Sequence, residues 1–514
     1  MKRSENKKSG GHRFLCVLSA ILLALGFGGY FAADWYVRTY GNTGFDSILF
    51  TLTGGLNGVQ SDLVTSYMLG GFVPAVLSTI VLQIFLFFPQ DITALKVSLF
   101  GKNRTLFPIH RGISGILAVV ITLCLLGVAG EKVGLFSYLV AYGKTGYIFE
   151  EEYKDPKDVQ ITFPEEKRNL VYIMLESMET SYLSKELGGG LPYNLIPELY
   201  DLATENTNFS HNDGIGGLVE VPGVSWTIGS MVGQTSGIPL RVPQGIDDWQ
   251  NGYGKDGIFL PGVTSLSDIL AENGYNQALM VGSDARFGGR KTYYLTHGTD
   301  KIYDIYTARK DGIVPKDYFV WWGMEDLHLF EYARQELTAI SQLDEPFAFT
   351  MLTVDTHHIG GYQCENCLGE YEETYEQSIS CSSRQVLEFV NWLKEQPFWE
   401  NTTVVITGDH LSMDNGYFQR NVDAGYNRMV YNCILNSPVS SDNTKNRDYC
   451  AVDLFPTTLA ALGCTIEGDR LGLGTNLFSS LPTLAEKWGF ERFDTELGRA
   501  SDYYIENFHK DPDA

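Results

Sequence analysis

Long apolar stretches without charge occupy the first quarter of the chain and predict membrane-spanning helices. Residues 14–33, 63–90 and 112–130 contain no charged side chain, and about 20 apolar residues are enough to cross a bilayer. A basic tail precedes the first stretch, so a cleaved signal peptide is an alternative for it. The two later stretches and the lack of a clear small-residue cleavage site favour a retained helix. The shorter apolar stretch 45–59 predicts an interfacial or re-entrant helix.

Short apolar runs alternate with amphipathic stretches from about residue 165 onward. The apolar runs, which we interpret as strands, are 169–176, 277–284, 347–355, 402–410 and 429–437. The helical patterns between them are 195–205, 265–274, 331–343 and 382–396. Several runs are continuously apolar, as in strands buried on both faces. The alternation predicts an α/β domain with a mostly parallel central sheet.

Loop charges predict the orientation in the membrane. The N-terminal tail and the loop 91–111 are basic, whereas 34–62 holds one basic residue, Arg38. Basic loops stay in the cytoplasm, so the N-terminus is expected inside and the α/β domain outside. The expected parts are a membrane domain over 1–143, a linker over 144–165, a catalytic domain over 166–485 and a polar tail over 486–514.

Composition and charge exclude some function classes. Hydrophobic residues make up 44% and charged residues 19% of the chain, and the net charge is −24. The first two values exclude a disordered protein, and the third argues against a nucleic-acid surface, which needs clustered Lys and Arg. Neither a Walker-type GxxxxGK[ST] nor a strand followed by GxGxxG occurs, so no nucleotide cofactor is expected.

The cysteines fit an exported domain. Cys16 and Cys124 fall in predicted spans, and the remaining six follow the third span. An even number outside the cytoplasm permits disulfide bonds, whose connectivity stays open. Cys364, Cys367 and Cys381 are close in sequence, so two of them can pair. A zinc site built on the CxxC of Cys364 and Cys367 is disfavoured because the chain has no second CxxC.

Acidic and imidazole side chains follow four predicted strands. Glu176 ends the first strand, Asp409 and His410 follow the strand at 402, His357 follows the strand at 347, and Asp284 follows the strand at 277. Ligands bind at the carboxyl ends of strands in open α/β sheets. Carboxylate oxygens with an imidazole nitrogen suit Mn²⁺ or Zn²⁺ better than Ca²⁺. Glu176, Asp409 and His410 are therefore a candidate divalent-metal site.

The stretch VSWTIGSMVGQTSGIPL (224–240) contains no ionisable group. Thr227 lies where a helix is expected to begin, so free backbone N–H groups there can hold a phosphate. A nearby metal ion would turn its neutral hydroxyl into a nucleophile. On local sequence alone, the alternative that Thr227 only caps the helix is favoured.

These motifs resemble the lipoteichoic acid synthase and phosphoglycerol transferase family, a membrane-anchored branch of the alkaline phosphatase and sulfatase superfamily. The resemblance runs from about 165 to 480. YIMLESMET is similar to the first metal motif and TGDH to the late one, while SWTIGSMVGQTSGIPL is similar to the nucleophile segment of the branch that modifies periplasmic glucans. The resemblance implies that Thr227 is the nucleophile and a metal ligand, together with Glu176, Asp409 and His410.

Two further segments resemble substrate-contact segments of that family. TVDTHH resembles the segment with a substrate-binding histidine, which is His357 here, and GRKTYYLTHGTDKIYD resembles the segment with a substrate-binding arginine, which is Arg290 here. Asp284 lies near a third substrate-contact segment. The resemblance implies an alkaline phosphatase-like catalytic domain and a divalent cofactor, with Mn²⁺ expected before Mg²⁺ or Zn²⁺. No Cys or Ser occupies a position like the formylglycine motif of sulfatases, so sulfatase activity is disfavoured.

The resemblance implies a transferase in a bacterial membrane. Glycerol phosphate would pass from phosphatidylglycerol through a phospho-threonine to a glycan outside the cytoplasm, releasing diacylglycerol. The alternatives are a lipoteichoic acid synthase, whose acceptor is a glycerol-phosphate polymer, and a phosphoethanolamine transferase. A phosphodiester or phosphomonoester hydrolase and an inactive scaffold are further alternatives. The complete set Glu176, Thr227, Asp409 and His410 argues against the scaffold.

Overall fold

The computed structural model describes residues 2–41, 44–54, 61–87, 95–99, 102–107, 111–241 and 257–510. The chain forms two compact units. A helical unit contains Met1–Asn42 and Val59–Ser137, and an α/β unit contains Thr43–Gly58 and Tyr138–Ala514. The predicted segments 63–90, 45–59 and 91–111 each lie partly outside the described residues. The last four residues of the predicted tail lie wholly outside them.

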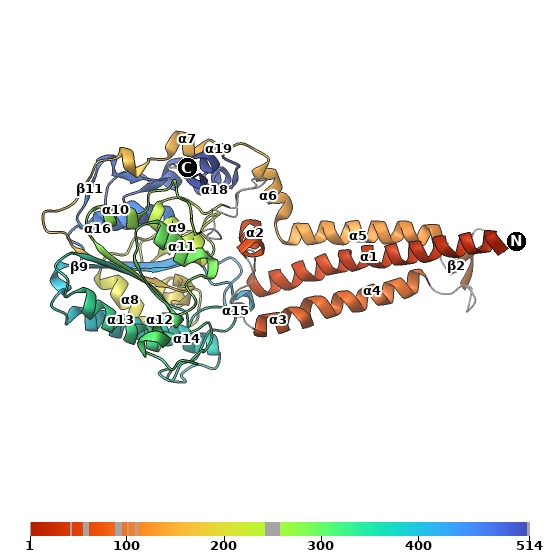
Figure 1. The fold of residues 1–514 in the computed structure, drawn as a ribbon, viewed down its shortest axis with the longest axis horizontal. Coiled ribbons are helices and arrows are strands. Elements are labelled where there is room, and N and C mark those ends of the chain that lie inside the picture. The colour runs from red at the N-terminus through yellow and green to blue at the C-terminus, as the bar shows by residue number, and fades with distance from the viewer. Residues whose placement is uncertain are drawn as a thin grey trace. The chain divides into compact units, whose positions relative to one another are not determined.

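The helical unit contains three helices long and apolar enough to cross a membrane, over Phe14–Tyr40, Leu63–Leu86 and Ile113–Lys132. Its elements are α1 (Lys2–Tyr40), α3 (Ser61–Tyr67), η1 (Met68–Phe72), α4 (Val73–Leu86), β1 (Leu95–Leu99), β2 (Lys102–Phe107) and α5 (Arg111–Lys132), with α6 (Leu135–Tyr142) at its boundary. Helix α1 packs along α4 and α5 (Figure 1). Lys132 pairs with Asp34 at 2.9 Å. The three predicted spans are therefore present as helices.

The α/β unit is built on a seven-stranded sheet with the order β5-β10-β9-β4-β8-β6-β7. The strands are β4 (Asn169–Leu175), β5 (Gly217–Leu218), β6 (Asn276–Val281), β7 (Lys301–Tyr303), β8 (Phe347–Leu352), β9 (Thr402–Gly408) and β10 (Val430–Leu435). From β9 to β7 every neighbouring pair is parallel. Strand β10 is antiparallel to both of its neighbours, β9 and β5. The predicted mostly parallel sheet is confirmed.

Helices cover both faces of this sheet (Figure 1). One face carries α8 (Pro197–Glu205), α12 (Ile305–Asp311), α13 (Asp326–Ile340) and α14 (Thr374–Lys394), and the other carries α9 (Thr227–Ser236), α10 (Leu266–Glu272), α11 (Arg290–Thr296) and α16 (Leu454–Ala461). Successive side chains of a strand point to opposite faces. In β4, Val171 and Ile173 join the core with the first group, and Leu170 and Tyr172 join the core with the second. This explains why the run is apolar throughout.

Helix α14 begins at Thr374, eight residues before the predicted start at 382. Its first turns are buried but polar. Glu376 accepts hydrogen bonds from the hydroxyls of Tyr193 and Tyr417 at 2.7 and 3.1 Å. Because polar residues face the interior here, the apolar periodicity that marks a helix is missing. The earlier start places Cys381 on this helix.

The segments expected as linker and tail both belong to the α/β unit. The first contains α7 (Ile148–Glu152), η2 (Pro156–Asp158) and β3 (Ile161–Thr162), and β3 pairs with β11 (Thr465–Ile466). The second includes α17 (Leu484–Trp488), α18 (Phe490–Gly498), α19 (Asp502–Tyr504) and η10 (Ile505–His509). Phe149 contacts Tyr504 and Phe508, with ring centroids 5.4 and 5.6 Å apart. The described part of the tail is thus packed, since its aromatic side chains join the core.

Helix α2 (Phe45–Gly54) belongs to the α/β unit rather than to the helical unit. Phe50 is buried, with its ring centroid 5.6 Å from that of Trp226, and the Asp46 carboxylate accepts the Gly223 N–H at 3.1 Å. The short apolar stretch therefore buries a side chain against the segment that precedes Thr227.

The remaining elements are η3 (Thr180–Tyr182), η4 (Lys185–Leu187), η6 (Phe287–Gly289), η7 (Trp399–Asn401), α15 (Asn415–Asn421), η8 (Ala451–Asp453), η9 (Glu467–Asp469), β12 (Arg470–Leu471) and β13 (Gly474–Thr475).

Candidate metal centre and nucleophile

Two adjacent parallel strands bring the predicted metal ligands together. Strands β4 and β9 pair in register up to Leu175 and Gly408, so the residues that follow them emerge side by side. The Asp409 N–H donates to the Leu175 carbonyl at 3.0 Å, which extends the ladder by one bond. Glu176, Asp409 and His410 are all buried, and one ligand atom from each lies within 4.8 Å of the others. Three of the four predicted ligands thus converge at the sheet edge.

The side chains in this cluster present acceptor atoms to one another. Asp409 uses one oxygen to accept the N–H groups of Ser177 and His410, each at 2.7 Å. Its other oxygen is buried without a hydrogen-bond partner and lies 3.3 Å from His410 Nε2. A Glu176 oxygen lies 3.7 Å from the same nitrogen. His410 Nδ1 lies 2.8 Å from the Leu411 carbonyl, and a proton on Nδ1 leaves the Nε2 lone pair facing the carboxylates.

This donor set fits a divalent cation. Two carboxylates and an imidazole nitrogen converge with one orphaned carboxylate oxygen, and buried charges of like sign need a positive partner. Burial raises the pKa of the Glu176 carboxyl, and the Asp409 charge raises it further. Burial alone lowers the pKa of His410, but Asp409 and Glu176 outweigh it and raise the value to about 9. The cluster therefore retains a proton that a bound cation would displace.

Thr227 is the first residue of α9, and its side chain faces the cluster. The hydroxyl oxygen lies 3.4 Å from His410 Nε2. The N-cap residue is Trp226, which makes no side-chain capping hydrogen bond, so Thr227 is not the cap of this helix. The first N–H groups of a helix have no acceptor within it and favour an anion. Thr227 thus places a hydroxyl beside the candidate metal ligands, at a helix end whose first N–H groups favour an anion.

Buried polar residues hold the start of α9 against the end of β9. The Gln234 amide donates to the Gly408 carbonyl at 3.1 Å and to the Ser230 hydroxyl at 2.9 Å, and the Ser230 hydroxyl bonds to the Asp409 carbonyl. The Tyr172 hydroxyl donates to the side-chain amide oxygen of Gln234 at 2.7 Å. Because Ser230 and Gln234 lie three and seven residues after Thr227, this network sets the position of the Thr227 hydroxyl.

Sequence reasoning missed these supporting residues as well as Ser177 and Glu220. Ser177 has a φ of 54°, a conformation that costs a non-glycine residue about 1 kcal/mol or more, and donates to Glu176 at 2.8 Å. Glu220 accepts the Leu411 N–H at 3.0 Å. Burial raises the pKa of Glu220 to about 7. Ser177 directly follows Glu176 in YIMLESMET, but nothing in the sequence marks Ser230, Gln234 or Glu220.

Arg290 is buried near the cluster, whereas the Asp284 carboxylate is engaged elsewhere. The Arg290 guanidinium donates to the Ser283 hydroxyl at 2.9 Å and to the carbonyls of Asp284 and Phe287 at 2.8 and 3.0 Å. Burial lowers its pKa to about 10, and Glu176 is the main group opposing that shift. The Asp284 carboxylate instead pairs with Arg286 at 2.7 Å. Asp284 therefore contacts Arg290 through its backbone only.

His357 lies in the loop after β8, beside two other aromatic rings. Its ring centroid is 4.3 Å from that of His358 and 4.5 Å from that of Trp322. Its Nδ1 lies 2.6 Å from the His358 carbonyl. Burial lowers its pKa to about 3, and the charges of His410 and Arg290 act in the same direction. The ring is therefore neutral at physiological pH, and Nε2 is left as an acceptor when Nδ1 carries the proton.

Comparison with known proteins finds sequences that are similar to this chain. Residues 247–464 match the sequence pattern of the sulfatase family. The chain is 29% identical over 464 residues to phosphoglycerol transferase I of Salmonella choleraesuis (strain SC-B67), covering 87% of this chain and 54% of that protein. It is 30% identical over 399 residues to the enzyme of the same name from Salmonella paratyphi B, covering 75% and 46%. The resemblance to this family in the sequence is confirmed.

Two solved structures of low sequence identity align with parts of this chain. The lipoteichoic acid synthase LtaP from Listeria monocytogenes has a TM-score of 0.48 and 19% identity, covering 63% of this chain and 79% of that one. The lipooligosaccharide phosphoethanolamine transferase A from Neisseria meningitidis has a TM-score of 0.49 and 12% identity, covering 88% and 84%. The chain spans about half the length of the curated relatives it matches.

Proposed function

We propose that this sulfatase-family protein is a membrane-anchored, metal-dependent phosphoglycerol transferase. It takes glycerol phosphate from phosphatidylglycerol, holds it on Thr227 and passes it to a glycan outside the cytoplasm. The observation that carries the proposal is the Thr227 hydroxyl 3.4 Å from His410 Nε2, at the start of a helix and beside two buried carboxylates. The three apolar helices supply the membrane anchor that a lipid donor requires, and the names of the curated relatives support the donor class.

The divalent cation belongs with Glu176, Asp409, His410 and the Thr227 oxygen. When bound, it would lower the pKa of the Thr227 hydroxyl and offset the charge of the phosphate. A mixed carboxylate and imidazole set suits Mn²⁺, with Mg²⁺ and Zn²⁺ as alternatives. In the first step the Thr227 oxygen bonds to phosphorus and the bond to the diacylglycerol oxygen breaks. The proton lost by Thr227 is balanced by the one that diacylglycerol gains.

The chain's own residues bind the phosphate and the second substrate. The N–H groups at the start of α9 and the Arg290 guanidinium face developing negative charge on the phosphate oxygens. In the second step the acceptor oxygen bonds to phosphorus and the bond from phosphorus to the Thr227 oxygen breaks. The proton of the acceptor hydroxyl passes to the Thr227 oxygen by way of His357. His357 is neutral, with an acceptor nitrogen, so it receives the proton of the incoming hydroxyl. This exchange needs no nucleotide.

The test of the proposal uses the purified full-length protein in detergent with fluorescent phosphatidylglycerol and Mn²⁺. We expect diacylglycerol release that accelerates when an oligosaccharide acceptor is added, with glycerol phosphate found on the acceptor. Phosphatidylethanolamine serves as the matched donor control. Release from that lipid instead would make the protein a phosphoethanolamine transferase. Steady cleavage of a generic phosphodiester without any acceptor would make it a hydrolase, and chain growth of glycerol phosphate would make it a polymer synthase.

Replacing His357 with asparagine is expected to slow transfer to the acceptor by about 100-fold and to trap the covalent intermediate. Asparagine keeps a donor for the His358 carbonyl but lacks the second ring nitrogen. Intact-protein mass spectrometry after mixing with donor should show more glycerol-phosphate adduct on H357N than on wild type. The control is His211→Asn, because His211 contacts Gly217 rather than the metal ligands. Equal adduct levels in H357N and wild type would exclude His357 from the second step.

A further inference from the structure

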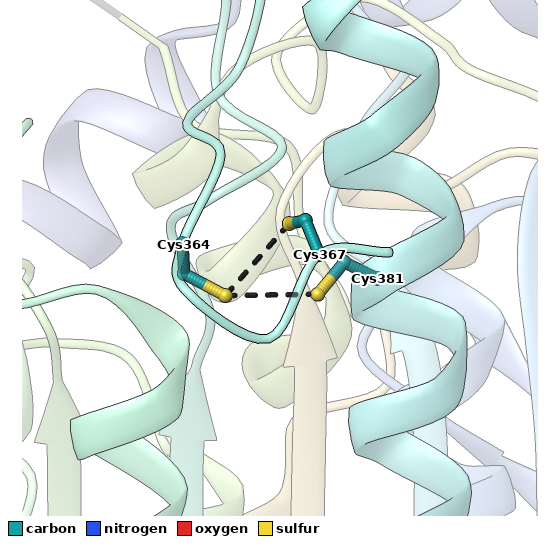
Figure 2. A group of neighbouring side chains, drawn as sticks. All are labelled: Cys364, Cys367 and Cys381. Carbon is teal, nitrogen blue, oxygen red and sulfur yellow. Dashed lines mark hydrogen bonds between the residues drawn. The ribbon is translucent and has the colours of Figure 1, made fainter. Parts of the chain in front are cut away.

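Three cysteines outside the catalytic centre bring their sulfur atoms together (Figure 2). Cys364 and Cys367 lie in the loop between β8 and α14, and Cys381 lies on α14. Cys364 Sγ is 3.8 Å from Cys367 Sγ and 3.6 Å from Cys381 Sγ, and all three sulfurs lie within 4.8 Å of one another. A disulfide has an S–S distance of about 2.05 Å, and none of the eight cysteines, all in the described residues, forms one.

These separations match those of thiolates around a tetrahedral zinc ion. A Zn–S distance of about 2.3 Å places two thiolate ligands about 3.8 Å apart along a tetrahedral edge. Cys364 is nearly equidistant from its two neighbours, so the geometry favours neither possible disulfide of Cys364. Any disulfide would use two of the three sulfurs and leave the third without a covalent partner. A single soft cation engages all three.

The Gln385 amide faces the same cluster, one turn after Cys381 on α14. Its Nε2 lies 3.4 Å from Cys381 Sγ and 4.0 Å from Cys364 Sγ, while its Oε1 is buried without a hydrogen-bond partner. Gln385 as a whole is only 5% exposed to solvent. Amide nitrogen and oxygen are assigned from the surrounding hydrogen bonds. Exchanging the amide nitrogen and oxygen by a half-turn of the side-chain amide places the unpartnered oxygen toward the sulfurs of Cys381 and Cys364.

We propose that Cys364, Cys367 and Cys381 bind a zinc ion, with the Gln385 amide oxygen as the fourth ligand. Binding releases the thiol protons, because the thiolate is the ligand form. Four protein ligands leave no open position, so the site is structural rather than catalytic. It joins the loop that also carries His357 to α14. The same loop already approaches this helix at Gly361, where an added Cβ would lie 2.1 Å from the Ser378 hydroxyl.

The test measures metal content and a cobalt spectrum, so it does not depend on the transfer reaction. Full-length protein purified in detergent without reductant is analysed for zinc by mass spectrometry. We expect Cys381→Ser to hold about one zinc ion fewer per chain than wild type. Cys433→Ser is the matched control, because Cys433 is also buried but contacts the Leu202 carbonyl instead. Asp409→Asn should retain the zinc of the cysteine cluster.

A second measurement uses wild type alone and so does not depend on a variant folding. Zinc is removed with a chelator under reducing conditions, and Co²⁺ is added. Three thiolates should give an intense sulfur-to-cobalt charge-transfer band, lost again on adding Zn²⁺. Mass mapping of a disulfide between any two of the three cysteines in the unreduced protein would overturn the proposal. So would equal zinc content in wild type and Cys381→Ser, or a cobalt spectrum without the thiolate band.

Discussion

Diacylglycerol release by the Thr227→Ala variant is expected to fall at least about 1,000-fold below wild type, in line with the loss of other catalytic nucleophiles. Alanine removes the hydroxyl that lies 3.4 Å from His410 Nε2 and that we propose forms the bond to phosphorus. It leaves the helix in place, because Trp226 is the N-cap and the Ser230 and Gln234 network remains. The measurement is release of fluorescent diacylglycerol, with intact-protein mass spectrometry to detect the adduct.

The Thr227→Ser variant is the matched control for this experiment. Serine keeps the hydroxyl and loses one methyl group, so a glycerol-phosphate adduct and part of the activity should persist. Wild-type turnover by Thr227→Ala would show that Thr227 only begins the helix, and the proposed covalent mechanism would fail. An adduct still present on Thr227→Ala would place the nucleophile on another residue.

The sheet and its connections could be predicted because they rest on buried apolar runs. All five predicted strands occur, and each of the five begins within one residue of its predicted start, whereas the short strands β5 and β7 were not predicted. Strand ends were also informative, because parallel neighbours deliver their following residues to one edge. That rule was enough to group Glu176 with Asp409 and His410. The family resemblance added Thr227, which the local sequence alone did not favour.

The parts that could not be predicted depend on contacts between distant polar residues. The Gln234 amide reaches the Gly408 carbonyl across 174 positions, and no local pattern marks such a pair. The cysteine cluster was missed for a similar reason. Cys381 joins Cys364 and Cys367 only because α14 begins at Thr374, and the polar residues of its first turns conceal that start. A count of CxxC motifs therefore does not reveal that all three sulfur atoms lie within 4.8 Å of one another.

Replacing Asp409 with asparagine is expected to weaken Mn²⁺ binding more than about 100-fold. Even the loss of a residue that only supports a metal ligand lowers metal affinity about 10- to 100-fold. Asparagine has the same shape, and its oxygen can still accept the N–H groups of Ser177 and His410. Its amide group would replace the orphaned oxygen that lies 3.3 Å from His410 Nε2. The variant should therefore fold but lose one ligand and one charge.

Isothermal titration with Mn²⁺ tests this prediction, since that ion prefers oxygen and nitrogen ligands to the thiolates of the cysteine cluster. Asp423→Asn is the control, because Asp423 is exposed and its carboxylate pairs with Lys185.

Wild-type affinity for Mn²⁺ should rise with pH between 6 and about 9, because the cation must displace a proton from a cluster in which the pKa of His410 is about 9. A pH-independent affinity, or equal binding by Asp409→Asn and wild type, would mean that the ion binds elsewhere. Transfer by the variant should recover in part at high Mn²⁺ concentration if Asp409 acts through the ion alone.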